Sequence, residues 1–397
     1  MTFPYDEPVD PASVNMDQNI LLKVVKLFQH QQSSGAFPGG QMVVRRHGKV
    51  VVNESIGIAR GFRTAEPNII NVQQNTPFPV YSTGKPLAAI VIALLEERGL
   101  LDIQAPIAEI IPEFACHGKD KITIIDVLTH RAGILVPSLS AENKLSDHEA
   151  SLNLLINSKP MYSLGTFAYM PLEYGILLCE IVRRITGKAL ADFFHDEFAI
   201  PLHLPALKFG LGDRSIESLA YSYWLGTKKV SYYIGKEKVV IPYSKVAEIF
   251  EEANNHKESF KFTNPASSMI TDAASLAAFY EFLVNNGVTN TGEKLLSEKI
   301  IHEYTKCSVS GWNRTLAKTY LSVGRGFILG TLLPSPYAYG WWNTKQCFGH
   351  PGSFSSVAFG DHKTKLAVAI FTNGNRGLSD FAKRFIPINH QLRKACF

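Results

Sequence analysis

Apolar residues recur along this chain of 397 residues with one period typical of helices and another typical of strands. The strongest helical pattern lies over residues 87–98, where apolar side chains stand at positions 87, 90, 91, 94 and 95. This spacing places them on one face of an amphipathic helix. Pro86 fits only in the first turn of such a helix, because proline has no N–H to donate. We therefore expect the helix to begin between Tyr81 and Gly84.

The remaining pattern predicts an α/β architecture. Further helices are expected over residues 17–32, 104–111, 123–129, 146–157, 172–186, 189–199, 271–285 and 378–395. Strands are expected over residues 41–46, 49–54, 230–234, 238–242, 326–332, 338–342, 346–350, 355–359 and 365–372. Because most strands lie near the two ends of the chain, we expect those ends to form one antiparallel sheet, covered by the first and last helices. Residues 1–79 and 266–397 would form this α/β sheet domain and residues 80–265 a mainly helical domain, with the site at their interface.

The composition is that of an ordinary globular protein, 46% hydrophobic and 19% charged. The net charge of +5 is spread thinly, which argues against a nucleic-acid partner and a polybasic membrane anchor. No apolar stretch is long enough to insert into a membrane, and the N-terminus lacks the apolar run of a signal peptide. The five cysteines form no C-x-x-C, so we expect reduced thiols in a cytoplasmic protein. The histidines show no ligand spacing either, and we expect no metal and no cofactor.

The segment Ser82-Thr83-Gly84-Lys85 carries the candidate chemistry. A serine and a lysine three residues apart lie on one face of the first helical turn, so their side chains can meet. A partly desolvated, neutral amine can take the proton of a serine hydroxyl and turn the serine into a nucleophile. The same residues are also compatible with a serine that caps a helix and a lysine on the surface.

Three further segments accompany this one at residues 128–133, 165–175 and 348–354. The second contains Tyr169-Met170-Pro171 and the third His350-Pro351-Gly352. With these motifs in this order over about residues 20–375, the chain resembles the serine β-lactamase and D-alanyl-D-alanine peptidase superfamily. It is most similar to the class C β-lactamase-like carboxylesterases of the family VIII type. The resemblance implies a β-lactamase/transpeptidase-like α/β (α+β) fold, with an antiparallel sheet flanked by helices and a mainly helical domain.

The resemblance also implies a role for each matching catalytic residue. Ser82 would be the acylated nucleophile, and Lys85 the neighbouring base that takes its proton. Tyr169 would act as general base and acid, with a pKa lowered by nearby cations. The backbone N–H groups of Ser82 and Ser353 would form the oxyanion hole.

The substrate-binding residues that the resemblance implies are Tyr81, His350 and Gly352, the last two on an edge strand. His350 replaces the lysine with which many relatives attract a substrate carboxylate, and Tyr169-Met170-Pro171 lacks the amide that β-lactamases use. Both departures remove polar recognition of penicillins and peptides, which carboxylesters do not need. His130 is interpreted as structural, with its imidazole tying a turn to backbone groups.

The sequence therefore predicts a serine hydrolase that cleaves carboxylesters through an acyl-Ser82 intermediate. Its partner would be a small-molecule ester or amide substrate. Three alternatives stay open at this point. The first is a β-lactamase or D-alanyl-D-alanine peptidase, and the second is an acyltransferase that passes the acyl group to an alcohol or amine. The third is a non-catalytic scaffold or filament protein of the same fold.

Overall fold

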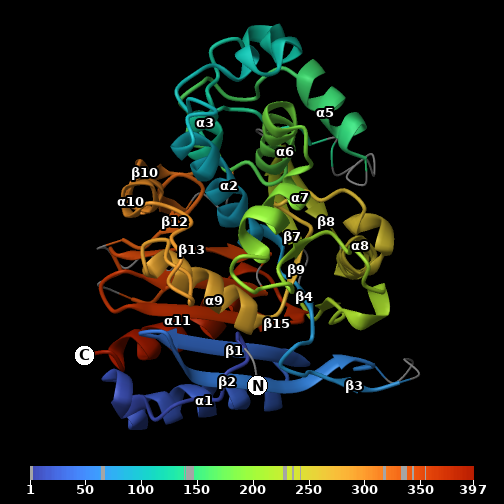
Figure 1. Ribbon diagram of the computed structural model, residues 1–397. Coiled ribbons are helices and arrows are strands. Elements are labelled where there is room, and N and C mark those ends of the chain that lie inside the picture. The colour runs from blue at the N-terminus through green and yellow to red at the C-terminus, as the bar shows by residue number, and fades with distance from the viewer. Residues whose placement is uncertain are drawn as a thin grey trace.

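A nine-stranded antiparallel sheet joins the two ends of the chain (Figure 1). The computed structural model describes residues 3–63, 68–137, 139, 147–226, 230–234, 237–241, 243–315, 319–331, 338–341, 344–353 and 355–397. The strands run in the order β10-β11-β12-β13-β14-β15-β1-β2-β3. Their bounds are β1 (Gly39–Arg46), β2 (Lys49–Arg60), β3 (Ile70–Asn71), β10 (Val309–Trp312), β11 (Tyr320–Val323), β12 (Ile328–Leu329), β13 (Cys347–Gly352), β14 (Ser356–Asp361) and β15 (Leu366–Thr372). The ends of the chain meet where β1 pairs with β15.

Helices cover both faces of this sheet (Figure 1). Their bounds are α1 (Gln18–Ser33) and α11 (Leu378–Lys394) on one face and α9 (Ala273–Val284) on the other. Neighbouring residues of a strand point to opposite faces, so the two faces are filled by alternate side chains of β1. Val44 packs in the same core as Phe28 and Phe385 of the two terminal helices. Val43 packs in the other core, together with Leu276 of α9.

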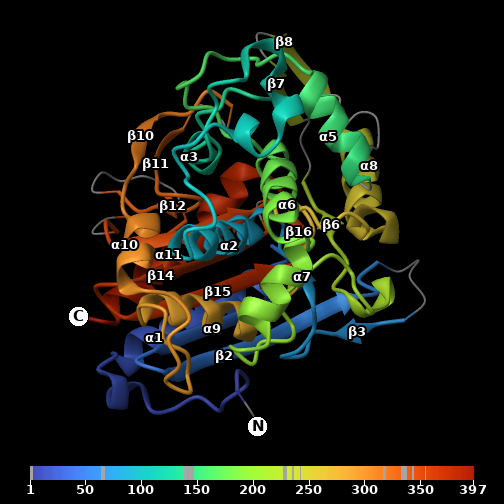
Figure 2. The same cartoon turned by 45° about the horizontal axis from the view of Figure 1, so that its top comes forward.

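A helical region lies beyond α9, with α2 at its centre (Figure 2). The helices of this region are α2 (Lys85–Glu97), α3 (Ile124–Leu128), α5 (His148–Asn157), α6 (Glu173–Thr186), α7 (Leu190–Phe194) with the π-helical turn η6 (His195–Ala199), and α10 (Glu298–Thr305). Every residue from Lys85 to Leu95 is buried, because α6, α7 and α10 all pack against α2. The expected helix is therefore present, but it is enclosed on all sides instead of presenting one polar face to solvent.

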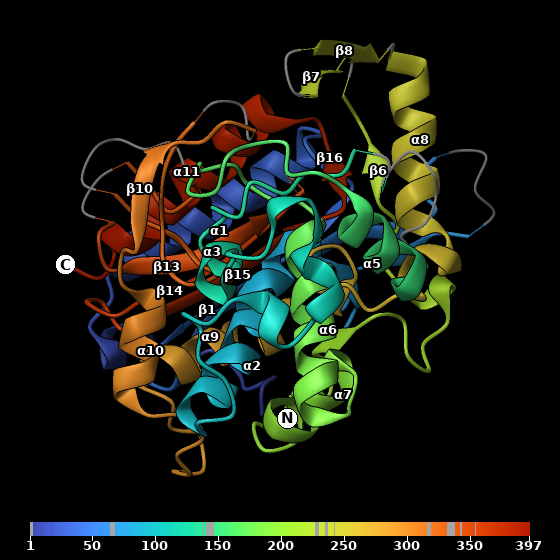
Figure 3. The same cartoon turned by 90° about the horizontal axis from the view of Figure 1, so that it is seen from above.

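Smaller elements complete the described fold. The short strands are β4 (Phe78–Pro79), β5 (Lys208–Phe209) and β9 (Met269–Thr271) in one sheet, β6 (Tyr223–Trp224) beside β16 (Gly374–Asn375), and the hairpin of β7 (Val230–Ile234) and β8 (Glu237–Ile241). The 3-10 turns are η1 (Pro11–Val14), η2 (Tyr81–Gly84), η3 (Ile107–Glu109), η4 (Pro112–Gly118), η7 (Ile216–Ser218) and η8 (Lys257–Phe260). The helix α8 (Tyr243–Asn255) lies with the β7–β8 hairpin at one side of the molecule (Figure 3).

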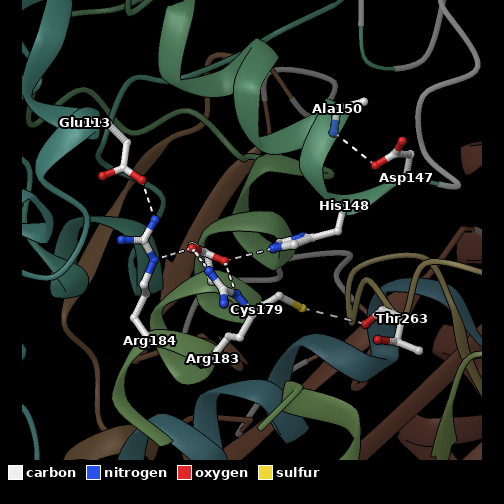
Figure 4. Close-up of polar contacts among 9 residues, drawn as sticks. Glu113, Asp147, His148, Ala150, Cys179, Arg183, Arg184 and Thr263 are labelled. Atoms are coloured by element: carbon white, nitrogen blue, oxygen red, sulfur yellow. Dashed lines mark hydrogen bonds and ion pairs between the residues drawn. The ribbon is translucent and has the colours of Figure 1, made fainter. Parts of the chain in front are cut away.

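A buried carboxylate ties α5, α6 and η4 together (Figure 4). Glu180 accepts hydrogen bonds from Arg183 and Arg184 and lies 3.1 Å from His148 Nε2. Arg184 also donates a hydrogen bond to Glu113 of η4. Burial alone would raise the pKa of Glu180, but these hydrogen bonds lower it to about 2. The carboxylate is therefore ionised at neutral pH and holds the outer helices in place.

Most of the predicted elements are confirmed. The helices α1, α2, α3, α5, α6, α9 and α11 begin and end within about two residues of their expected ranges. The β1–β2 and β14–β15 hairpins are also present, and so is the small β7–β8 hairpin. The antiparallel sheet built from both ends of the chain and flanked by helices is confirmed as well.

Other expectations are wrong. The helix expected over residues 104–111 is only the short turn η3. No strand forms in the described residues 338–341, where Ala338 and Gly340 have φ angles of 58° and 112°, outside the extended region. The strand expected over residues 326–332 is limited to β12, and residues 332 and 342 lie outside the described residues. The sequence pattern did not predict α8, α10, β10 or β11.

Candidate active site

Ser82 lies on a strained turn at the start of α2. Tyr81 has a φ of 53°, a left-handed conformation that is uncommon for a tyrosine, and its hydroxyl lies 2.6 Å from that of Ser222. The turn η2 then passes directly into α2, as the sequence predicts. Gly84 is needed in this turn, because a Cβ there would lie 2.5 Å from the carbonyl oxygen of Pro265. The turn presents Ser82 to a cavity of about 240 Å³.

The cavity brings together residues from distant parts of the chain. It is lined by Tyr81, Ser82, Tyr169, Pro171, Leu172, Ala266, Ser267, His350, Pro351, Ser353, Leu378 and Phe381. None of these described side chains carries a formal charge when the histidine is neutral. The cavity therefore suits an uncharged, partly apolar group. Gly352 was expected to bind substrate, but it is absent from this lining and packs against the backbone of Val80, where a Cβ would lie 2.0 Å from the carbonyl oxygen.

Lys85 is the base that the sequence predicts beside the serine. Its Nζ donates a hydrogen bond to Ser82 Oγ at 3.2 Å and another to the carbonyl oxygen of Pro171 at 2.8 Å. The side chain is fully buried, and this burial lowers the pKa of Lys85 from 10.5 to about 7. A buried ammonium loses its hydration, so the neutral amine is well populated at physiological pH. The surface lysine of the alternative interpretation is excluded.

Glu173 also acts on the pKa of this amine, although the sequence pattern did not single it out. Its charge raises the pKa of Lys85 and so opposes part of the effect of burial. The carboxylate is itself buried and accepts hydrogen bonds from the N–H groups of Val136 at 2.8 Å and Leu172 at 3.2 Å. Burial raises the pKa of Glu173, while the N–H donors lower it. The sequence signal that could have identified Glu173 is its acidic side chain among the apolar residues at the start of α6.

Tyr169 lies against the same lysine, but its ionisation differs from the expectation. The Nζ atom of Lys85 lies 4.9 Å from the centroid of the Tyr169 ring. Burial raises the pKa of Tyr169, and a hydrogen bond with the Ser82 side chain only partly opposes this shift. The expected lowering of this pKa is therefore wrong. The reason is that the nearby cation is itself disfavoured by burial, so a tyrosinate would have too little compensation.

His350 is neutral and lies on β13, in a segment that pairs with β14 on one side only. Its Nδ1 lies 2.6 Å from the carbonyl oxygen of Pro351, and burial and the charge of Lys85 lower its pKa to about 3. β12 pairs only with residues 348 and 349, so no described strand covers the outer edge of residues 350–352. The expected edge strand is therefore wrong, because β13 lies between β12 and β14 in the sheet, but the locally open side of residues 350–352 still tolerates a proline. A neutral imidazole cannot attract a substrate carboxylate as a lysine would.

Two further predictions concern Ser353 and His130. Ser353 follows β13 with a φ of 38° and lines the same cavity as Ser82. Its N–H as an oxyanion donor stays a prediction. The structural interpretation of His130 is confirmed, because its Nδ1 accepts a hydrogen bond from the N–H of Met170 at 3.2 Å. Burial holds the pKa of His130 well below its ordinary value, so the imidazole is neutral.

The described residues contain no group of three or more side chains that could hold a metal ion. All five cysteines are described, and each has a free thiol. No helix in the described ranges combines the length and the apolar character that a membrane span needs. The chemistry that this arrangement can perform is nucleophilic attack by a serine, with an amine and a phenol at hand to move protons.

Comparison with known proteins gives a family match over most of the chain. The sequence model of the family described as Beta-lactamase matches residues 24–392. Over 389 residues the chain is 26% identical to the esterase/beta-lactamase LipL of Mycobacterium tuberculosis, covering 94% of this chain and 86% of that protein. Over 379 residues it is 21% identical to an N-acetylmuramyl-L-alanine amidase of Bacillus subtilis, covering 89% of this chain and 80% of that protein.

Solved structures share the fold. A penicillin-binding protein homologue from Caulobacter crescentus superimposes with a TM-score of 0.78 at 24% identity, covering 96% of this chain and 98% of that one. A family VIII carboxylesterase superimposes with a TM-score of 0.75 at 23% identity, covering 96% of this chain and 99% of that one. The predicted β-lactamase/transpeptidase-like fold is confirmed.

Proposed function

The chain belongs to the Beta-lactamase family, and from that premise we propose that it hydrolyses carboxylesters through an acyl intermediate on Ser82. Family membership supports a serine hydrolase in general. The observation that carries the proposal is the 3.2 Å hydrogen bond between Lys85 Nζ and Ser82 Oγ, with the pKa of the amine at about 7. A base with a pKa near the working pH combines a populated neutral form with useful proton affinity.

Acylation follows from this geometry. Ser82 Oγ attacks the ester carbonyl carbon while its proton passes to the neutral amine of Lys85. The C–O bond to the alcohol then breaks, and the leaving oxygen takes a proton from the phenol of Tyr169. The phenol recovers that proton from the Lys85 ammonium. The raised pKa keeps Tyr169 protonated at neutral pH, so the phenol has a proton to pass to the leaving oxygen.

Deacylation repeats the steps with water as the nucleophile. Water attacks the acyl carbon and gives one proton to Lys85, and the bond between the acyl carbon and Ser82 Oγ breaks. Ser82 regains a proton, and the free acid leaves. The backbone N–H groups of Ser82 and Ser353 are the proposed donors to the oxyanion in both tetrahedral intermediates.

The uncharged cavity favours esters over β-lactams and peptides. His350 is neutral, and Tyr169-Met170-Pro171 offers no side-chain amide to a substrate. The wall of the cavity also contains three apolar side chains, those of Leu172, Leu378 and Phe381. At about 240 Å³ the cavity matches a small or medium acyl ester, our proposed substrate class. The name of the relative LipL combines esterase and β-lactamase, so both substrates belong in the test.

Hydrolysis of p-nitrophenyl butyrate by the wild type and the Ser82→Ala variant tests the proposal. We expect the variant to lose at least about a thousandfold in kcat, because a nucleophile has no substitute in this site. A fluorophosphonate probe should label the wild type and not the variant. Retained turnover in Ser82→Ala would reject the mechanism, and a wild type that the probe fails to label would favour a scaffold role. Nitrocefin turnover equal to ester turnover would favour a β-lactamase, and acyl transfer to added alcohol an acyltransferase.

We also propose a cytoplasmic location. The support is chemical, because all five cysteines are free thiols, which a reducing compartment maintains. Fractionation of the native cells, with immunodetection of the chain, tests the location. Recovery in the culture medium or the cell envelope would contradict it.

A further inference from the structure

The loop that carries Tyr169 is fixed by side chains from outside the loop. The N–H of Met170 donates a hydrogen bond to His130 Nδ1. Lys85 Nζ donates one to the carbonyl oxygen of Pro171, and Asn264 Nδ2 donates one to that of Leu172. His130 follows α3, Lys85 lies on α2, and Asn264 follows α8, so all three partners belong to the surroundings of the helical region. They fix the residues after Tyr169 but not Tyr169 itself.

The two main-chain polar groups of Tyr169 are held by the connection between β10 and β11. Asn313 Oδ1 accepts a hydrogen bond from the N–H of Tyr169 at 3.4 Å. The hydroxyl of Thr315 donates to the carbonyl oxygen of Tyr169 at 2.9 Å. The N–H of Arg314 donates to the carbonyl oxygen of Phe167 at 3.0 Å, so the loop is also held two residues earlier. The contact therefore resembles a short strand pairing made partly by side chains.

Asn313 and Thr315 also contact each other. Asn313 Oδ1 accepts a hydrogen bond from the N–H of Thr315 at 2.9 Å and lies 3.0 Å from its hydroxyl oxygen. Asn313 is only 1% exposed, and its own N–H donates to the carbonyl oxygen of Thr319 at 2.8 Å. A turn closed in this way holds both side chains in one arrangement toward Tyr169.

This contact joins the sheet to the helical region. β10 is the last strand of the nine-stranded sheet, and β10 and β11 lie beside the helical region (Figure 2). Ser82 and Lys85 stand on α2, whereas the position of the phenol depends on a loop whose backbone is held by the hairpin. A rotation of the Tyr169 backbone would move the phenol oxygen away from Ser82. Proton transfer depends steeply on such distances.

We propose that Asn313 and Thr315 are positioning residues that set the Tyr169 phenol against Ser82. The inference rests on the proposed function, because it assigns these residues to the proton transfers of that mechanism. Their hydrogen bonds reach Tyr169 itself. The neighbouring hydroxyl of Ser310 in the same hairpin instead lies 2.7 Å from that of Ser322 and 3.2 Å from Cys307 Sγ.

Matched variants separate positioning from folding. Thr315→Val keeps the shape of the side chain and removes the hydroxyl, Thr315→Ser keeps the hydroxyl, and Ser310→Ala removes a hydroxyl of the same hairpin that does not reach Tyr169. We measure kcat and KM with ethyl butyrate, whose alkoxide leaving group needs a proton from the phenol, together with the midpoint of thermal unfolding. We expect Thr315→Val to lower kcat by about tenfold to a hundredfold with KM within about twofold. Thr315→Ser should restore most of the kcat, and Ser310→Ala should leave it unchanged.

The Asn313→Ala variant provides a second test of the proposal. It removes the acceptor for the Tyr169 N–H, and we expect a loss of kcat at least as large as in Thr315→Val. If this variant does not fold, the comparison of Thr315→Val with Thr315→Ser tests the proposal by itself. Equal losses in Thr315→Val and Ser310→Ala would overturn the proposal, because they would mark a general loosening of the hairpin. Full kcat in Thr315→Val would overturn it too, while loss of turnover in Ser82→Ala would keep the proposed function in place.

Discussion

Replacing Glu173 by glutamine should shift the acidic limb of the pH profile of kcat/KM toward lower pH. Lys85 takes the Ser82 proton only as a neutral amine, so activity rises as the pH passes its pKa of about 7. Burial lowers this pKa, and the charge of Glu173 raises it. Glu173→Gln removes the charge and leaves the burial, so the pKa of Lys85 falls further.

The size of the effect follows from the same contributions. The pKa of Lys85 stands at about 7 instead of 10.5, so about half of the amines are neutral at pH 7 instead of about one in three thousand. Loss of one nearby charge should move the limb by about one pKa unit, equivalent to about 1.4 kcal/mol. The glutamine keeps an acceptor for the Val136 N–H but turns an NH2 group toward the Leu172 N–H. We expect this contact to cost about 1–2 kcal/mol of unfolding free energy.

The assay is kcat/KM for p-nitrophenyl butyrate between about pH 5 and pH 9 at constant ionic strength, read at the isosbestic wavelength of the product. The control is Glu109→Gln, which removes an exposed carboxylate that is not among the charges acting on Lys85. Its profile should match the wild type. A Glu173→Gln limb that stays in place or moves to higher pH would refute the reasoning, since Lys85 would then not be the titrating base or Glu173 would not be charged.

Further predictions concern the phenol of Tyr169, Gly352 at the end of β13, and Glu180 between the outer helices. Tyr169→Phe should lower kcat for an alkyl ester such as ethyl butyrate by about a hundredfold or more in steady-state assays, because the leaving alkoxide loses its proton donor; a loss below about threefold would contradict the assigned role. Gly352→Ala should lower the thermal midpoint and the activity together, because the added Cβ would lie 2.0 Å from the Val80 carbonyl oxygen; an unchanged midpoint would show that the strand shifts freely. Because the pKa of Glu180 is about 2 in the folded chain against an ordinary 4.5, its contribution is complete above about pH 4.5 and is lost as the pH falls toward 2. Glu180→Gln should therefore cost about 2 kcal/mol near pH 6 and much less near pH 3, as denaturant unfolding at the two pH values would measure, and an equal cost at both would contradict the ionised state.

Local relations in the chain were decided by the sequence alone. The apolar spacing over residues 87–98 and the position of Pro86 predicted where α2 begins, because both depend only on helical geometry. The same geometry placed Ser82 and Lys85 on one face of the first turn, where the structure has them in hydrogen-bond contact. The pairing of the two chain ends in one sheet also followed from the order of the predicted strands.

The electrostatic state of the site was decided only by tertiary packing. The pKa of Lys85 depends on its complete burial and on Glu173, and neither is visible in the spacing of residues. The same burial reverses the shift expected for Tyr169, since desolvation acts on every charge placed in the cavity. The contact of Asn313 and Thr315 with Tyr169 joins residues more than a hundred positions apart. Such contacts form because the folded sheet brings its edge beside the helical region, and no local pattern in the chain encodes that meeting.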